Sequence, residues 1–134
     1  MATHLMKTGG KRLRPLLTIC SSEIFNYKGD RHINLAACVE LIHNATLLHD
    51  DVIDNSLSRR GFKTTNAIWG NKSSILAGDY LLSRCFEMMV DDGSDEILKI
   101  LSSVSSEIAQ GEILQLQFEK KVDMVEKNYL DIIS

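Results

Sequence analysis

The sequence predicts an all-α fold, and two observations support this prediction. Apolar residues recur mainly every three to four positions along the 134 residues, and no stretch sustains the two-residue alternation of a β-strand. The chain has a single proline, no repeat and no low-complexity linker, which indicates one helical unit that could be the front piece of a larger one. With 44% hydrophobic and 25% charged residues, it has the composition of an ordinary globular protein.

Five segments share this helical spacing and are separated by polar or glycine-containing breaks. We expect them at about residues 12–27, 33–54, 73–90, 94–120, and from Asp123 onward. Pro15 falls in the opening turn of the first segment, where proline is tolerated. Asp123 and Glu126 form a capping box for the last segment. Residues 55–65 predict a polar loop, and residues 66–69 a short turn.

Bulk properties disfavour several classes of function. The formal net charge of −3 gives no support for nucleic-acid binding. The longest apolar run, residues 35–48, is interrupted by Glu40 and His43, so no transmembrane span is expected. The first residues lack the apolar core of a signal peptide. The three cysteines are an odd number without a CxxC pair, which favours buried reduced thiols and a cytoplasmic location.

Three aspartates in a short helical stretch are the strongest functional signal. Asp50 and Asp54 are four residues apart and share a helix face, while Asp51 is turned about 100° away. Carboxylates one turn apart can each give an oxygen to Mg²⁺, which keeps waters and phosphate oxygens as its other ligands. The alternative is a solvated acidic helix end, although the negative end of a helix is unfavourable for acidic residues without a cation.

Basic residues occur in sequence on both sides of this acidic motif. Lys11 and Arg14 lie three apart at an expected helix start, where they could join backbone N–H groups in binding a phosphate. Arg59 and Arg60 follow the aspartates on the expected loop. Each pair alone could be a solvated surface charge. Together with a metal-type carboxylate set, the two pairs indicate a diphosphate site.

Several motifs in order resemble one enzyme family. They are Gly9-Gly-Lys-Arg-Leu-Arg-Pro15, Glu40-Leu-Ile-His43, Leu48-His-Asp-Asp-Val-Ile-Asp54, Arg59-Arg-Gly61 and Gly78-Asp-Tyr-Leu81. Over nearly the whole chain the sequence resembles the N-terminal part of trans-type polyprenyl diphosphate synthases, close to the octaprenyl branch. This resemblance implies an isoprenoid synthase-type helical bundle, usually a homodimer. It also implies Mg²⁺-dependent condensation of an allylic diphosphate with isopentenyl diphosphate to a long-chain trans-polyprenyl diphosphate.

The resemblance also implies roles for individual residues. Asp50 and Asp54 would be direct Mg²⁺ ligands with Asp51 supporting them, and Arg59 would bind the allylic diphosphate. The diphosphate of isopentenyl diphosphate would be held by Lys11, Arg14, His43 and Arg60. Gln115 resembles a polar position that faces the metal cluster. A lone helical histidine is more often an ordinary packed or surface residue, and only its spacing from Asp50 singles out His43.

Ala45 bears on product length. In the resembled family, a bulky side chain near this position blocks the growing product, so a small alanine followed by Thr46 suggests a product longer than farnesyl. Ordinary small-residue helix packing is the alternative explanation for Ala45.

The family's second aspartate-rich motif has no counterpart in this sequence. Asp91-Asp-Gly-Ser-Asp95 matches the pattern literally, but Gly93 and Ser94 predict a loop and a helix cap. We therefore expect residues 1–134 to be about the N-terminal half of a catalytic domain, truncated to about five helices. Its uncovered apolar faces would meet a partner, such as a complementary C-terminal half.

We expect the isolated chain to be inactive and consider two other functions. A terpene cyclase is disfavoured, because Lys11, Arg14 and His43 would serve a second diphosphate that a cyclase lacks. A non-catalytic helical subunit or a gene remnant without enzyme activity remains open. The DNA downstream of the Ser134 codon distinguishes an enzyme fragment from a gene remnant. A neighbouring reading frame that carries the second aspartate motif would indicate a split enzyme, and its absence would favour the remnant.

Overall fold

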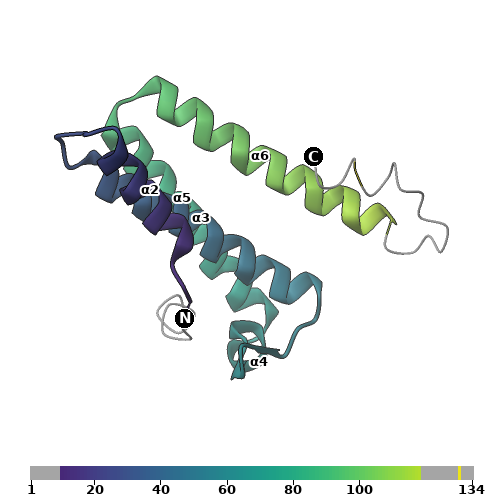
Figure 1. The fold of residues 1–134 in the computed structure, drawn as a ribbon. Coiled ribbons are helices and arrows are strands. Elements are labelled where there is room, and N and C mark those ends of the chain that lie inside the picture. The colour runs from purple at the N-terminus through teal and green to yellow at the C-terminus, as the bar shows by residue number, and fades with distance from the viewer. Residues whose placement is uncertain (1–9, 119–129, 131–134) are drawn as a thin grey trace. The chain divides into compact units, whose positions relative to one another are not determined.

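The computed structural model describes residues 10–118 and residue 130, and within them the chain is almost entirely helical (Figure 1). Its elements are α2 (Leu13–Ile24), α3 (Arg31–Ile53), β1 (Ser58–Arg59), β2 (Phe62–Lys63), α4 (Thr65–Trp69), α5 (Asn71–Asp92) and α6 (Asp95–Phe118). The chain divides into two compact units, with the boundary after Ser94. The predicted all-α class is confirmed, and the four long helices begin and end within three residues of their expected bounds.

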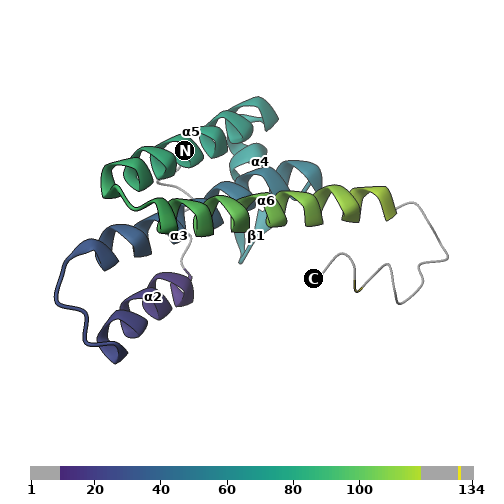
Figure 2. The same ribbon diagram turned by 90° about the horizontal axis from the view of Figure 1, so that it is seen from above.

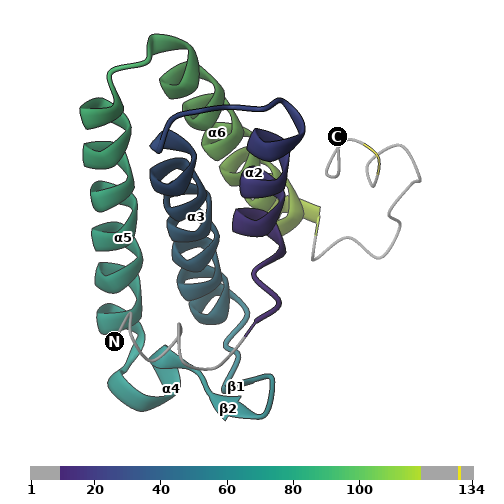
Figure 3. The same cartoon turned by 60° about the vertical axis from the view of Figure 1, so that its left-hand side comes forward.

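Helices α3 and α5 run antiparallel and form the core of the first unit (Figure 3). Burial on α5 follows one helical stripe, at steps of three or four residues: Ser74, Gly78, Leu81, Cys85 and Met89. This stripe packs on α3, where Ala45 and Leu48 are fully buried against Leu81. The core therefore rests on small and aliphatic side chains that let the two helices approach closely.

Polar contacts at two levels tie α3 to α5. At one end, the Ser74 hydroxyl donates to the carbonyl of Leu48 at 2.9 Å. In the middle, Cys38 and Cys85 are buried, and the Sγ of each lies within 4 Å of the other's carbonyl oxygen, at 3.9 and 3.6 Å. Burial of free thiols was expected and is confirmed at these two positions, whereas Cys20 is exposed.

Helix α2 lies on the side of α3 away from α5, as Figure 2 shows. None of its residues is buried, and Leu13, Leu17 and Ile24 are more than half exposed. The helix ends earlier than expected because Asn26 has a left-handed backbone, with φ 54°. The expectation of uncovered apolar faces holds for this helix in the part of the chain that the structure describes.

The expected loop at residues 55–65 is in fact a tight β-hairpin. Ser58 pairs with Lys63 and Arg59 with Phe62 in an antiparallel register. Arg60 and Gly61 form its two-residue turn with φ of 52° and 81°, the positive angles that such hairpins require. The short α4 follows directly and confirms the turn expected at residues 66–69. Together the hairpin and α4 lie at the carboxyl end of α3 (Figure 3).

Helix α6 makes up the described part of the second unit and confirms the fourth expected segment. The helix expected from Asp123 onward lies outside the described residues. Among the described helices, none combines the length and the hydropathy that a membrane span requires.

The literal match Asp91–Asp95 spans a helix end, as its glycine and serine predicted. Helix α5 finishes at Asp92, and Gly93 caps it with φ 70°. The Asp92 carboxylate is 4% exposed and binds the guanidinium of Arg31 through two contacts, Nε to Oδ1 at 2.8 Å and Nη2 to Oδ2 at 2.5 Å. This fork joins the start of α3 to the end of α5. The carboxylate of Asp92 therefore has a structural partner within the fold.

Replacing Asp92 with Asn should lower the thermal unfolding midpoint at pH 7. The Arg31 guanidinium holds the pKa of the Asp92 carboxyl below its usual range. A depressed folded-state pKa gives stability that is present above the unfolded value of about 3.9 and is lost as the pH falls through the folded value. Thermal melts followed by circular dichroism should show the two proteins diverging at pH 7 and converging at acid pH, once the pH has fallen through the folded-state pKa of Asp92.

The neighbouring exposed Asp91→Asn variant is the matched control and should melt close to the original chain at both pH values. A deficit of the same size at neutral and acid pH in Asp92→Asn would contradict the ion-pair explanation.

Candidate functional site

A pocket of about 500 Å³ lies between the start of α2, the middle of α3 and the hairpin. Three separate segments line it, and two of them, the start of α2 and the hairpin, contribute the lysine and arginine side chains. The lining residues are Gly10, Lys11, Arg12, Leu13, Arg14, Glu40, His43, Asn44, Leu47, Arg59 and Arg60. The structure thus brings together five of the residues singled out in the sequence, namely Lys11, Arg14, His43, Arg59 and Arg60. Five Lys or Arg side chains around one pocket favour an anion with several oxygens, such as a phosphate or diphosphate.

The aspartates lie beside this pocket at the carboxyl end of α3. Asp50 and Asp54 are one helical turn apart, with the Asp54 N–H donating to the Asp50 carbonyl at 2.8 Å. The side chain of Asp54 is exposed and that of Asp50 is half-buried. Neither lines the pocket. Within the described residues, no three His, Cys, Asp or Glu side chains gather closely enough to hold a metal ion by themselves.

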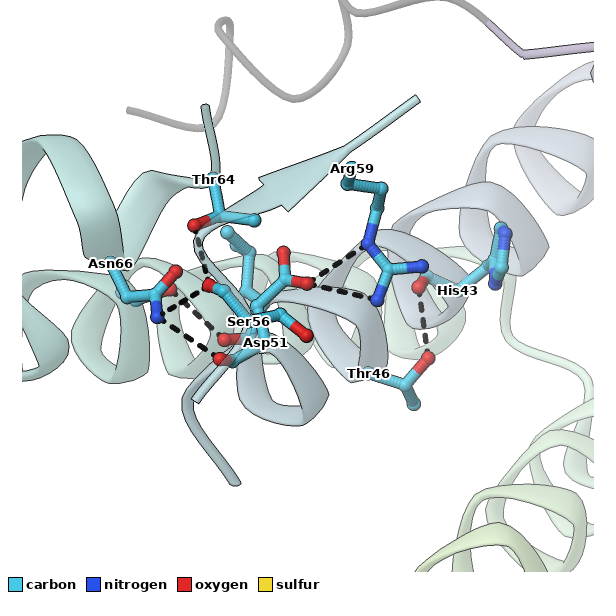
Figure 4. Close-up of polar contacts among 9 residues, drawn as sticks. His43, Thr46, Asp51, Ser56, Arg59, Thr64 and Asn66 are labelled. Atoms are coloured by element: carbon cyan, nitrogen blue, oxygen red, sulfur yellow. Dashed lines mark hydrogen bonds and ion pairs between the residues drawn. The ribbon is translucent and has the colours of Figure 1, made fainter. Parts of the chain in front are cut away.

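Asp51 differs from its two neighbours because it is buried. Its side chain is 1% exposed, and Oδ1 accepts from both Nε and Nη2 of Arg59 at 2.9 Å (Figure 4). A buried carboxylate is stable only with such a counter-ion. The second oxygen, Oδ2, is also buried and has no hydrogen-bond partner among the described residues. Asp51 therefore fixes Arg59, and with it the hairpin, to α3.

A set of hydrogen bonds around the backbone of Asp51 completes this attachment (Figure 4). The Asn66 amide donates to the carbonyls of Asp51 and Ser56, at 3.0 and 3.1 Å. The Ser56 N–H donates to the same Asp51 carbonyl at 2.9 Å, and the Thr64 hydroxyl donates to Ser56 O at 2.8 Å. Asn66 thus connects the last turn of α3, the hairpin entry and α4.

The surroundings of His43 favour its neutral imidazole form. Burial lowers its pKa from the usual value, and the positive charge of Arg14 lowers it further, followed by smaller effects of Arg60 and Arg59 and an opposing effect of Glu40. A neutral imidazole carries one N–H donor and one acceptor. In the pocket, His43 can therefore hydrogen-bond an anion near pH 7 without adding a sixth positive charge.

Two other residues from the sequence analysis lie elsewhere. Ala45 is fully buried in the core with Leu48 and Leu81, which fits the alternative of small-residue helix packing. Gln115 is an exposed residue of α6, in the second unit.

Sequence reasoning missed three residues that organise the site. Arg12 and Glu40 line the pocket and form an ion pair at 2.6 Å, and Asn66 clamps the hairpin. Arg12 and Glu40 both lie within the motifs quoted in the sequence analysis. Nothing in the spacing of these motifs indicates that the two side chains form an ion pair. Asn66 follows the hairpin, in a segment for which the sequence predicts only a short turn.

The described residues therefore form a helical protein with a multi-cation anion pocket beside a carboxylate-bearing helix end. This combination defines a class of all-α proteins with a cationic pocket suited to an anion. The Polyprenyl synthetase family model matches residues 1–134. The chain belongs to this family of prenyltransferase enzymes.

Individual relatives agree with the family match. The chain is 43% identical over 130 residues to octaprenyl diphosphate synthase of Escherichia coli (strain K12), covering 97% of this chain and 40% of the relative. It superposes on a decaprenyl diphosphate synthase from Rhodobacter capsulatus with a TM-score of 0.93 and 50% identity, covering 98% of this chain and 40% of that one.

A second solved structure is a polyprenyl synthase from Caulobacter crescentus CB15 complexed with calcium and isoprenyl diphosphate. It matches with a TM-score of 0.94 and 47% identity, over 98% of this chain and 40% of that one. The chain thus spans about 40% of the length of these relatives.

Replacing Asn66 with Leu should destabilise the first unit by about 1–3 kcal/mol, the cost of leaving a buried polar group without its partner. Leucine has the same number and branching of side-chain heavy atoms as asparagine but cannot donate to the Asp51 and Ser56 carbonyls. Urea denaturation followed by circular dichroism measures the loss. Asn34→Leu makes the same change at an exposed position of α3 and should cost much less. Equal losses for the two variants would remove the clamp as an explanation.

Proposed function

We propose that the chain provides the first half of a prenyltransferase site. The whole site would condense an allylic diphosphate with isopentenyl diphosphate and release diphosphate. One observation supports this proposal most strongly. Three segments of the sequence line one pocket next to the aspartates, and they contribute Lys11, Arg14, His43, Arg59 and Arg60. Two adjacent sites, one with cations and one with carboxylates for Mg²⁺, suit a reaction in which two diphosphates must lie side by side.

The residues present fit an Mg²⁺ ion at Asp50 and Asp54. Mg²⁺ in proteins commonly takes one or two carboxylates, with waters and substrate phosphate oxygens as its remaining ligands, so two aspartates one turn apart suffice. The buried Asp51 supports this helix end through Arg59 rather than by contributing an exposed oxygen. Calcium and isoprenyl diphosphate in the Caulobacter crescentus relative support a divalent cation beside a diphosphate. Bound there, Mg²⁺ would stabilise the negative charge of the departing diphosphate.

The chain's own residues would bind and orient the two substrates. Lys11, Arg14, His43 and Arg60 would hold the diphosphate of isopentenyl diphosphate in the pocket. Arg59 contacts Asp51 from the pocket wall, which places its guanidinium between the two proposed sites and suits the allylic diphosphate. Fixed cations stabilise charge as it develops on a leaving group, because they need no reorganisation during the reaction. Gln115, on α6, would contribute a polar side chain.

The product, the partners and the location belong to the same proposal. A long-chain trans-polyprenyl product is supported by the octaprenyl and decaprenyl synthases among the relatives. A cytoplasmic location is part of the proposal. The exposed apolar side chains of α2 suit a complementary C-terminal half, and a homodimer is the family's usual assembly. Residues 1–134 would then be the N-terminal half of the catalytic domain, and alone would not turn over.

Inorganic diphosphate should bind the chain, and loss of the pocket cations should weaken that binding. Lys11→Gln and Arg14→Gln should each lower the affinity by about tenfold, the scale of one charge-assisted contact of ~1.4 kcal/mol. Isothermal titration at low salt measures this effect. Lys72→Gln removes one exposed positive charge from the start of α5 and is the matched control. Affinities unchanged in both pocket variants would refute the anion site.

Mg²⁺ should strengthen diphosphate binding, and this gain should depend on the aspartates. In Asp50→Asn and Asp54→Asn the Mg²⁺-dependent gain should disappear while the affinity without Mg²⁺ stays close to that of the original chain. Asp91→Asn, at an exposed position near the end of α5, is the control for loss of one carboxylate. Retention of the full gain in both variants would place the metal elsewhere.

The isolated chain should not incorporate radiolabelled isopentenyl diphosphate into a longer product, even with Mg²⁺ and an allylic diphosphate. Mixing it with the part of a related synthase that it does not span should restore incorporation if the two halves associate. Sustained turnover by the isolated chain would overturn the proposal of inactivity. Failure of every mixture, with intact diphosphate binding, would favour a non-catalytic helical subunit.

A further inference from the structure

One carboxylate lies in the otherwise cationic pocket. Glu40, on α3, is among the lining residues, and its side chain is 14% exposed. A negative charge a few ångströms from an anion site weakens the attraction that the surrounding cations provide. If field strength alone governed the pocket, an uncharged residue would serve better at this position. The carboxylate therefore calls for a different explanation.

Glu40 is held in place from two sides. Its Oε1 accepts from Arg12 Nη1 at 2.6 Å, across 28 positions of sequence. Asn44, one helical turn onward, donates to the same oxygen at 3.3 Å and to the backbone carbonyl of Glu40 at 2.7 Å. The carboxylate is thus oriented by its own helix toward the segment that precedes α2.

That segment has an unusual backbone at Arg12. Its φ and ψ are 50° and 36°, the left-handed region, and it precedes the first turn of α2 without a side-chain cap. Such a conformation costs on the order of 1–3 kcal/mol for a non-glycine residue and persists only where the surroundings hold it. Two residues earlier, a Cβ on Gly10 would lie 2.7 Å from Arg60 Nη1, so the chain passes close to the pocket wall.

We propose that Glu40 is a positioning residue for the pocket. Its ion pair with Arg12 fixes the left-handed turn at Arg12, and this turn places Lys11 on one side and Arg14 on the other at the pocket. The inference rests on the proposed function, because it assigns Glu40 a role in the same anion site. It predicts that removing a negative charge from the pocket weakens anion binding, whereas electrostatics alone predicts the opposite.

The sign of the change in affinity tests the proposal. Inorganic diphosphate is titrated calorimetrically into the full chain and into Glu40→Gln, which keeps the size of the side chain and removes its charge. We expect the affinity to fall by about tenfold, ~1.4 kcal/mol. Glu23→Gln, an exposed position of α2, removes the same charge outside the pocket and should bind like the original chain. Tighter or unchanged binding by Glu40→Gln would overturn the proposal.

A double-mutant cycle locates the effect in the ion pair. Arg12→Gln breaks the pair from its more exposed end. Because it also removes a pocket cation, its own loss of affinity is compared with that of the double variant. If the two side chains act through one contact, the double variant should bind no more weakly than the weaker single variant. Losses that add in the double variant would show that the two residues act separately.

Tryptic cleavage provides a readout that needs no ligand. The bonds after Lys11 and Arg12 lie in the positioned turn, and Glu40→Gln should speed cleavage there several-fold while cleavage after the exposed Lys72 stays unchanged. Failure of the original chain to bind diphosphate would refute the proposed function but leave this test intact. Equal cleavage rates in both proteins would refute the positioning role.

Discussion

The ion pair between Asp51 and Arg59 is the contact on which the rest of the candidate site depends. A carboxylate that is 1% exposed costs several kcal/mol to bury unless a cation reaches it, and Arg59 arrives from a hairpin eight residues further on. Asn66 binds the backbone carbonyl of the same aspartate, so the helix end and the hairpin are held together twice. Because Arg60 follows directly in the hairpin turn, this attachment also sets the pocket wall to which Arg60 contributes.

The packing of α3 on α5 fixes the same helix end from the opposite side. Ser74 binds the carbonyl of Leu48. The ring of His49 lies over Gly78, where an added Cβ would meet its Nε2 at 2.4 Å, and the same nitrogen is 3.3 Å from the carbonyl of Ile75. Residues 48 and 49 immediately precede the aspartates, so contacts from α5 and from the hairpin meet within one helical turn. A glycine and a serine at these α5 positions serve close approach as much as helix formation.

Periodicity predicts the helices because their burial follows it, as the α5 stripe from Ser74 to Met89 shows. The same geometry places Asp50 and Asp54 on one face without any knowledge of the fold. The hairpin escapes prediction because strands of two residues have no measurable alternation, and only Arg60-Gly61 hints at its turn. The burial of Asp51 depends on a tertiary partner, and the left-handed Arg12 has no sequence signal, since arginine is not a residue that favours this conformation.

Paired charges explain how a short chain can hold so many ionisable side chains in one region. Arg59 with Asp51, and Arg12 with Glu40, each form a neutral pair that attaches one segment to α3. Lys11 and Arg14 line the pocket without a carboxylate partner among the described residues, and Asp54 is exposed at the adjoining helix end. Because the neutral pairs hold the backbone of these segments against α3, we expect the side chains of Lys11, Arg14 and Asp54 to keep their positions whether or not a ligand is present. An anion and a cation binding side by side would then meet groups of opposite sign that need little rearrangement. Such preorganisation would favour the proposed diphosphate–metal site, because less ordering is required on binding.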